Sequence, residues 1–199
     1  MTGLSFFSGL SVVIPTRRDE PPDWVQDIIT TSRNEVSEVM VVIERDADPI
    51  AMRPSVSGAE RVRVLIQPGT TKADALNIGL QSAKNPFVIF LDADVQLEAG
   101  QLSIVRKLLD ETDFVSVAYG QRAPPFPVIS FVSGWFFGAK RSTFIDIGGW
   151  AEGYVEDVET ARRILQAGHT IRTAPFAVKL RRPVRNPIAK GLATIFPNR

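Results

Sequence analysis

The sequence contains no cysteine and only one histidine, His169. The lack of cysteine excludes a disulfide scaffold, a zinc–cysteine site, an iron–sulfur cluster and cysteine nucleophilic catalysis. A single histidine excludes a multi-histidine metal site and disfavours a serine–histidine triad. No apolar run approaches the roughly 18 residues that cross a bilayer. Residues 1–10 have no basic start before their apolar residues, so they do not predict a signal peptide, and we expect a cytoplasmic protein.

The composition is that of a globular chain with an uneven distribution of charge. The 199 residues are enough for one ordinary domain, and 44% of them are hydrophobic and 23% charged. The net charge is +1, yet nine lysines and arginines and no acid follow Glu159, which leaves −8 for residues 1–159. The basic C-terminal segment either binds an anionic partner or is exposed to solvent without one.

Short apolar stretches alternate with amphipathic ones in the first half. The pattern predicts strands at 10–15, 39–43, 61–66, 87–91 and 114–119, and helices at about 21–32, 71–82 and 97–111. Such alternation is typical of an α/β fold, with a mostly parallel, Rossmann-like sheet flanked by helices. The second half is richer in proline, glycine and aromatic residues and predicts a helix at about 155–166 and an extended stretch at 169–180. We expect one domain, with a nucleotide-binding half (1–120), a site-building half (121–180) and a basic tail (181–199).

Two aspartates, Asp92 and Asp94, directly follow the most apolar predicted strand. Ligands of open α/β sheets bind beyond the carboxyl ends of the strands, and alternate side chains of an extended chain point the same way. Paired carboxylates beside a buried strand are costly unless a cation offsets them, and hard oxygen ligands suit Mg²⁺ or Mn²⁺. Gln96 could add an oxygen. The alternative is that Asp94 caps the helix predicted from Leu97. Asp46 and Asp48 repeat the spacing, and we interpret them as solvated or adjacent to a nucleotide.

Five short motifs occur in order along the chain. They are Ser-Val-Val-Ile-Pro-Thr (11–16), Lys-Ala-Asp-Ala-Leu-Asn-Ile-Gly-Leu (72–80), Phe-Leu-Asp-Ala-Asp-Val (90–95), Gly-Gly-Trp (148–150) and Val-Glu-Asp-Val (155–158). Together they resemble nucleotide-sugar-dependent glycosyltransferases of the GT-A fold, in the large inverting family 2 that includes cellulose, chitin and hyaluronan synthases. The resemblance extends over residues 10–170.

The resemblance implies roles for particular carboxylates. Asp92 and Asp94 match the family's acidic motif, which holds Mg²⁺ or Mn²⁺ against the diphosphate of a UDP- or GDP-sugar donor. Asp157 matches the base that takes the proton of the acceptor hydroxyl, and Glu156 beside it lies on the acceptor side. The alternative for Glu156 and Asp157 is favourable placement of acids at a helix N-terminus.

The resemblance also assigns positions around the donor and the acceptor. Pro15, Thr16, Arg17 and Glu44 match segments near the nucleotide, and Lys72 and Ala93 lie in motifs near the donor; the alternative for Lys72 is a solvated helix residue. Gly134 and Trp135 match a segment under the acceptor. Of the three aromatics at 135–137, we expect at least two to pack in the core. His169 is expected to be structural.

Several features depart from the family pattern. The usual acidic-glycine-serine loop is replaced by residues 44–48, which leaves the nucleotide open. The Gln-x-x-Arg-Trp motif of processive members is missing, which favours single addition. The run at 92–96 is locally similar to dolichyl-phosphate mannose synthases, so the acceptor could be a glycan, a lipid-linked group or a small molecule.

The basic tail and two rival functions complete the predictions. Residues 186–196 predict a short amphipathic helix that docks on the domain or makes peripheral contact with an anionic membrane. Arg181, Arg182 and Arg185 could instead close over the diphosphate. A sugar-phosphate nucleotidyltransferase is one rival, although no glycine-rich loop follows the first strand, and a non-catalytic nucleotide-binding relative is another. No nucleic-acid partner is expected, and no Gly-x-Gly-x-x-Gly motif supports a dehydrogenase.

Overall fold

The computed structural model describes residues 9–18, 20–47, 49, 61–119, 132–153 and 156–182. Several predictions fall on residues outside these ranges. They concern residues 1–8 of the segment that does not predict a signal peptide, Asp48, residues 121–131 at the start of the second half, and Val155. They also concern the tail beyond Arg182, with Arg185 and the amphipathic segment 186–196.

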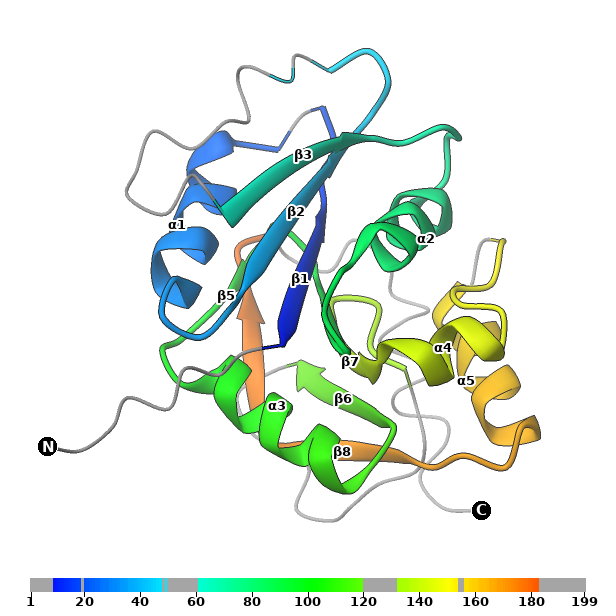
Figure 1. Cartoon of the computed structure of the whole chain (residues 1–199). Coiled ribbons are helices and arrows are strands. Elements are labelled where there is room, and N and C mark those ends of the chain that lie inside the picture. Colours follow the sequence, from blue (N-terminus) through cyan, green and yellow to red (C-terminus); the bar gives the residue numbers. More distant parts are fainter. Residues whose placement is uncertain are drawn as a thin grey trace, which may run out of the picture.

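In the described ranges, eight strands form the sheet, in the order β3-β2-β1-β4-β7-β6-β8-β5, and Figure 1 shows β3, β2 and β1 side by side. Their bounds are β1 (Leu10–Pro15), β2 (Glu38–Ile43), β3 (Val62–Ile66), β4 (Phe87–Leu91), β5 (Val95–Gln96), β6 (Phe114–Tyr119), β7 (Phe136–Lys140) and β8 (Ile171–Leu180). The first four strands in the order are parallel, and β6 and β8 are parallel to each other. Strand β7 runs antiparallel between β4 and β6, and the short β5 pairs antiparallel with the end of β8.

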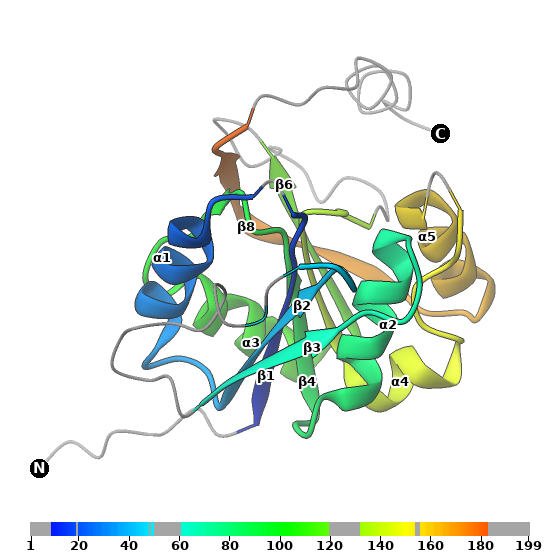
Figure 2. The same ribbon diagram turned by 90° about the horizontal axis from the view of Figure 1, so that it is seen from above.

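Helices cover both faces of the sheet. Figure 2 shows α1 (Pro22–Ser32) and α3 (Gln101–Glu111) on one face, and α2 (Lys72–Ser82), α4 (Arg141–Asp146) and α5 (Glu156–Gln166) on the other. Each face has its own apolar core, because alternate residues of a strand point to opposite sides. Val12 and Ile14 pack with the α1–α3 layer, whereas Val13 packs with the α2–α4–α5 layer. The predicted α/β class is therefore confirmed.

Aromatic side chains fill the core under α2, α4 and α5. Phe90, Phe137, Phe144 and Trp150 meet edge to face, with ring centroids 5.2 to 5.7 Å apart. This geometry suits the quadrupoles of the rings. Phe137 and, on the opposite face, Phe136 are fully buried, which confirms that at least two of the three aromatics at 135–137 are core residues.

Local sequence explains where α2 begins. The Thr71 hydroxyl accepts a hydrogen bond from the Asp74 backbone N–H (3.1 Å), and the Asp74 carboxylate accepts one from the Thr71 N–H (2.9 Å). This capping box satisfies two amide groups that a helix otherwise leaves free. It places Lys72 in the first turn of α2, as the sequence predicts.

The start of α3 differs from the prediction, because a distant residue decides it. Glu35, in the turn after α1, accepts hydrogen bonds from the N–H groups of Gly100 and Ser103 (both 2.8 Å) and from the Ser103 hydroxyl. These bonds satisfy free amides of the first turn, so the helix begins at Gln101 and not at Leu97. Asp94 is therefore not its N-cap, and that alternative is wrong. Strands β5 and β7 and helix α4 were not predicted either.

Glu38 is a buried carboxylate at the start of β2. It accepts hydrogen bonds from the Lys84 N–H and the Ser11 hydroxyl (both 2.7 Å) and forms an ion pair with Arg63 at 3.2 Å. Burial raises the pKa of Glu38, but these bonds and the Arg63 charge outweigh it and hold the pKa below its ordinary value. The charged form is thus favoured in the folded protein.

Because its folded pKa is depressed, Glu38 stabilises the protein above its unfolded pKa, and this contribution is lost as the pH falls through the folded pKa. Urea unfolding between about pH 6 and about pH 3 should therefore show a steeper loss of stability for the parent than for Glu38→Gln. An exposed control, Glu98→Gln, should follow the parent curve. Parallel curves for the parent and Glu38→Gln would contradict this role.

Candidate active site

Lys72 and Asp92 join two elements at the carboxyl edge of the sheet. Asp92 follows the last residue of β4, and its backbone N–H donates to the carbonyl of Trp135 (2.9 Å) just before β7. The Lys72 Nζ lies 2.6 Å and 2.8 Å from the two carboxylate oxygens of Asp92. It also donates to the carbonyl of Gly134 (2.5 Å). Lys72 is thus bound into the site, and the alternative of a solvated helix residue is wrong.

Asp157 reaches the same place from the first turn of α5. A Cβ atom added to Gly134 would lie 3.6 Å from the Asp157 Oδ2 and 3.8 Å from the Lys72 Nζ. The small residue therefore lies close to both the carboxylate of α5 and the ammonium of α2. The Val158 N–H donates to the Asp157 Oδ1 (2.8 Å), which leaves Oδ2 on the Gly134 side.

Two further carboxylates at this edge are partly desolvated. Burial raises the pKa of Asp94, and the charge of Asp92 raises it further, while Lys72 and Arg182 lower it. Burial also raises the pKa of Glu156, with Lys72 lowering it and Asp157 and Asp92 raising it. The site thus carries an excess of negative charge that is only partly balanced by nearby cations.

Glu20 belongs to the same group, and the sequence analysis missed it. Burial and the charge of Asp92 raise its pKa, while the Arg17 N–H, which donates to it at 2.9 Å, and Arg182 lower it. An ion pair of 3.8 Å joins it to Arg182. No motif marked Glu20, because its interaction with the charge of Asp92 arises only when β1 lies beside β4 in the folded chain.

The ends of β1, β2 and β3 lie level beside this cluster. The Thr16 N–H donates to the Val42 carbonyl (2.8 Å), and the Gln67 N–H donates to the Ile43 carbonyl (2.9 Å). Pro15 ends β1, Arg17 is exposed just beyond it, and Glu44 follows β2, so these predicted nucleotide positions share one edge with Asp92. Two other predicted residues have packing roles as well: Ala93 is 1% exposed, and the Trp135 indole N–H donates to the Val117 carbonyl (3.2 Å).

The end of β8 fastens onto Asp94 and α1. The Arg181 N–H donates to the Asp94 carbonyl (2.7 Å), and the Arg181 guanidinium pairs with Asp27 of α1 at 2.6 Å. The Arg182 guanidinium lies 4.9 Å from the centre of the Trp24 ring. The Arg181 side chain is thus paired with α1, whereas the charge of Arg182 lowers the pKa of Asp94.

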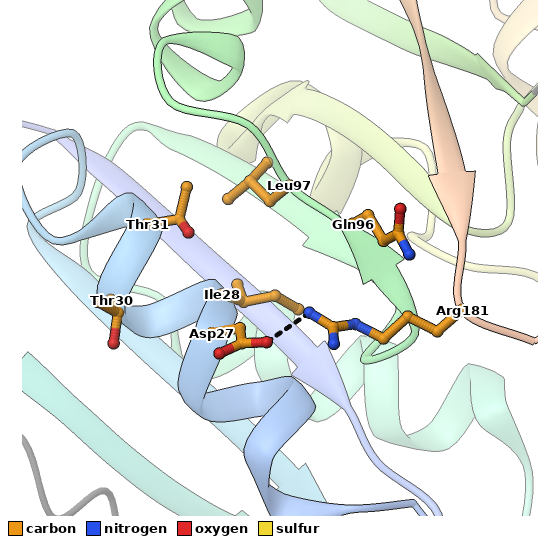
Figure 3. Close-up of a pocket in the computed structure, with 7 residues that line it drawn as sticks. All are labelled: Asp27, Ile28, Thr30, Thr31, Gln96, Leu97 and Arg181. Atoms are coloured by element: carbon orange, nitrogen blue, oxygen red, sulfur yellow. Dashed lines mark hydrogen bonds and ion pairs between the residues drawn. The ribbon is translucent and has the colours of Figure 1, made fainter. Parts of the chain in front are cut away.

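Gln96 lies in a separate cavity. It occupies β5 and lines a space of about 350 Å³ with Asp27, Thr31 and Arg181 (Figure 3). The cavity is bounded by α1 and the ends of β5 and β8. The cavity lies beside α1, and the place of Gln96 among the metal ligands stays a prediction.

His169 lies at the other end of the sheet. Its Nδ1 is 3.1 Å from the Asp113 carboxylate, and its ring meets the edge of Phe114 with centroids 5.5 Å apart. Phe114 and Ile171 are paired at the start of β6 and β8. Through β7, Phe114 is aligned with Val88 near the start of β4, whereas Asp92 follows the end of β4. These contacts agree with the structural role predicted for His169.

The carboxylates suit a divalent cation that is shared with a substrate. Within the described ranges, no three histidine, cysteine, aspartate or glutamate side chains gather around one metal position. Mg²⁺ is commonly held by one or two protein carboxylates together with substrate phosphates. Asp92 and Asp94, in an acidic and half-buried setting, fit such a cation.

The fold and this edge of the sheet define the class of protein. Residues 11–148 match glycosyl transferase family 2, and the chain belongs to that family. It has the GT-A fold, so the predicted family and fold are confirmed. The local similarity to dolichyl-phosphate mannose synthases stays a prediction.

Particular relatives extend beyond this chain. A pre-mycofactocin glycosyltransferase of Mycobacterium tuberculosis, known from two strains, is 28% identical over an alignment that covers 85% of this chain and 42% of the relative. This chain therefore spans about two fifths of the length of the curated relatives it matches.

Solved structures share the fold at low sequence identity. The mannosyltransferase PcManGT from Pyrobaculum calidifontis, in complex with GDP-Man and Mn²⁺, superposes with a TM-score of 0.72 at 23% identity, over 91% of this chain and 59% of that one. TarS residues 1–349 from S. aureus, in complex with UDP-GlcNAc, superpose with a TM-score of 0.67 at 15% identity, over 91% and 60%. Among the described residues of the present chain, none of the helices has the length and apolar character needed to cross a membrane.

Proposed function

We propose that this chain transfers a sugar from a UDP- or GDP-sugar to an acceptor hydroxyl or a lipid phosphate, with a divalent cation and with inversion at the anomeric carbon. The observations that carry the proposal are the contacts of Lys72 with Asp92 and with Gly134, and the closeness of the base candidate Asp157 to the same Gly134. Family membership favours glycosyl transfer over the nucleotidyltransferase alternative.

Asp92 and Asp94 are the residues that would hold Mg²⁺ or Mn²⁺. The leaving group is a nucleoside diphosphate, and the cation would supply the charge that stabilises it as the glycosidic bond breaks. Lys72 and Arg182 add positive charge around Asp92 and Asp94. Mn²⁺ and GDP-Man in the PcManGT complex support this choice of cofactor and donor class.

The donor and the acceptor would approach from two sides. Pro15, Thr16, Arg17 and Glu44 border the nucleotide, on the edge formed by β1 and β2, while Lys72 and Ala93 belong to the donor side of Asp92. Gly134, Trp135 and Glu156 border the acceptor side, where Asp157 takes the proton of the attacking hydroxyl. A carboxylate is needed there, because a sugar hydroxyl is a poor nucleophile until its proton is accepted.

The proposal also covers the number of sugars that are added, the location of the enzyme and the type of acceptor. The missing Gln-x-x-Arg-Trp motif favours the addition of one sugar over polymer synthesis. The cytoplasmic location and a contact of the basic tail with an anionic membrane stay predictions from the sequence. A lipid-linked, glycan or small-molecule acceptor fits the proposal equally.

Donor binding and hydrolysis test this function. The melting temperature of the purified chain is measured with UDP-GlcNAc or GDP-Man, in the presence of Mn²⁺ or of EDTA. In a separate assay, the release of UDP or GDP from the same donors is measured. One donor should raise the melting temperature only with Mn²⁺, because a ligand of the native state stabilises it, and should be slowly hydrolysed. Pyrophosphate released from a nucleoside triphosphate and a sugar phosphate would indicate the nucleotidyltransferase instead. Binding without any turnover across a donor and acceptor panel would indicate a non-catalytic relative.

A further inference from the structure

The side-chain amide of Asn77 holds the backbone of Trp150 at two points. Its Nδ2 donates to the Trp150 carbonyl, and its Oδ1 accepts from the Trp150 N–H, both at 2.9 Å. The two residues are 73 positions apart, so this is a tertiary contact between α2 and the turn after α4. Because both edges of one amide are used, the orientation of the peptide at Trp150 is fixed and not only its distance.

A glycine makes this approach possible. Gly149 has a φ of +66°, and a Cβ atom added there would lie 2.6 Å from the Asn77 Oδ1. A larger residue would both strain the backbone and displace the amide. The Gly-Gly-Trp motif and the asparagine of the Lys-Ala-Asp-Ala-Leu-Asn motif are thus two halves of one contact.

The same segment is tied to α5. The Ala151 N–H donates to the Thr160 hydroxyl (2.9 Å), and Thr160 is fully buried. Apolar contacts of Ala161 and Ile164 also hold α5 against this core. Apolar packing is non-directional, however, so the hydrogen bonds are what set the position of α5 along its axis.

These bonds connect the two helices that carry the proposed chemistry. Helix α2 begins with Lys72, which is bound to Asp92, and α5 begins with Glu156 and Asp157. We propose that Asn77 and Thr160 are positioning residues that hold α5 in register with α2, and so hold Asp157 at a fixed place relative to the Lys72–Asp92 contact. The catalytic consequence rests on the proposed function, whereas the structural clamp does not.

A displacement of the base would be costly for turnover but not for donor binding. A shift of about 1 Å in a reacting group can reduce the rate by about 10²-fold. Apart from Lys72 at the start of α2, the donor side is built from β1, β2 and β4, which Asn77 and Thr160 do not contact through these bonds. The effect should therefore fall on kcat and leave the KM of the donor nearly unchanged.

The register of α5 is measured directly with spin labels, which is simple in a chain without cysteine. Labels are placed at the exposed positions Gln81 of α2 and Gln166 of α5, each changed to cysteine, and their distance distribution is recorded. We expect a narrow distribution in the labelled parent. It should broaden or shift in Asn77→Ala and in Thr160→Val, and it should stay narrow in Thr160→Ser, which keeps the hydroxyl.

A matched control and a milder variant separate positioning from loss of folding. Glu35→Gln weakens a comparable set of hydrogen bonds on the opposite face of the sheet, so it should lower the melting temperature without changing the label distance. Asn77→Asp keeps the acceptor for the Trp150 N–H but turns an acceptor toward the Trp150 carbonyl, and it serves where Asn77→Ala does not fold.

Turnover is followed as the release of GDP from GDP-Man or UDP from UDP-GlcNAc, with Mn²⁺. Asn77→Ala and Thr160→Val should lower kcat about 10- to 100-fold, with the donor KM within about twofold of the parent. Thr160→Ser should restore most of kcat. Unchanged label distances in both variants would overturn the clamp, and changed distances with an unchanged kcat would overturn its catalytic role. A parent that turns over no UDP- or GDP-sugar of the donor and acceptor panel refutes the proposed function, while the label distances still decide whether the clamp holds α5.

Discussion

Asp157→Asn is expected to lower the turnover of donor and acceptor by a factor of about 10² to 10⁴, the usual contribution of a general base. The amide is nearly the same size and keeps an oxygen for the Val158 N–H, which now donates to the Asp157 Oδ1. It cannot accept the proton of the attacking hydroxyl. Donor affinity in the presence of Mn²⁺, measured by titration calorimetry, should change little.

Glu159→Gln is the matched control for this substitution. Glu159 lies in the same first turn of α5 and pairs with Arg162 on the exposed side. It removes the same charge from the helix N-terminus, so a role of Asp157 in helix stability alone would give both variants similar effects. We expect Glu159→Gln to retain nearly all turnover. Equal losses in the two variants, or a normal kcat for Asp157→Asn, would reject Asp157 as the base.

Asp94→Asn is expected to weaken Mn²⁺-dependent donor binding by about 100-fold or more. Changes to residues that only support a metal ligand already cost about 10- to 100-fold in affinity, and Asp94 is proposed as a ligand itself. Titration of GDP-Man and UDP-GlcNAc with Mn²⁺ and with EDTA measures the effect. Tight binding that is independent of metal and survives Asp94→Asn would contradict the metal role.

Without metal, Asp94→Asn should be at least as stable as the parent, although it binds the donor more weakly. Burial and the charge of Asp92 raise the folded pKa of Asp94, so the native state binds more protons than the unfolded chain. Stability is therefore lost as the pH rises from the unfolded to the folded pKa, and the neutral asparagine removes this loss. At neutral pH the variant should melt at or above the temperature of the parent. Asp110→Asn, on the exposed side of α3, should change neither donor binding nor this pH dependence.

Local patterns in the sequence were sufficient for most of the elements. The strands that precede Thr16, Glu44 and Asp92 were predicted close to their observed bounds, since buried parallel strands are short, continuous and apolar. The start of α2 was predicted because its capping box lies within four residues of sequence. The family motifs named Asp92, Asp94 and Asp157 as site residues, and in the structure Asp157 and Lys72, which is paired with Asp92, both lie close to Gly134.

Contacts between distant segments decided what those patterns left open. Glu35 sets the start of α3 from 65 positions away, and this ends the capping alternative for Asp94. Gln96 shares the extended run of Asp94 yet lines the cavity beside α1, because β5 pairs with the end of β8. Glu20 joins the acidic cluster without any motif, since only the folded chain brings it beside Asp92 and Arg182.

The amino-acid sequence alone determined the family, the α/β architecture and the chemical types at the carboxyl edge of the sheet. These depend on hydrophobic periodicity and on short motifs, which act over a few neighbouring residues. The tertiary structure decided that Lys72 binds Asp92 rather than solvent and that Asn77 holds the turn leading to α5. Those contacts link residues 20 to 73 positions apart, and their geometry exists only after both faces of the sheet have packed.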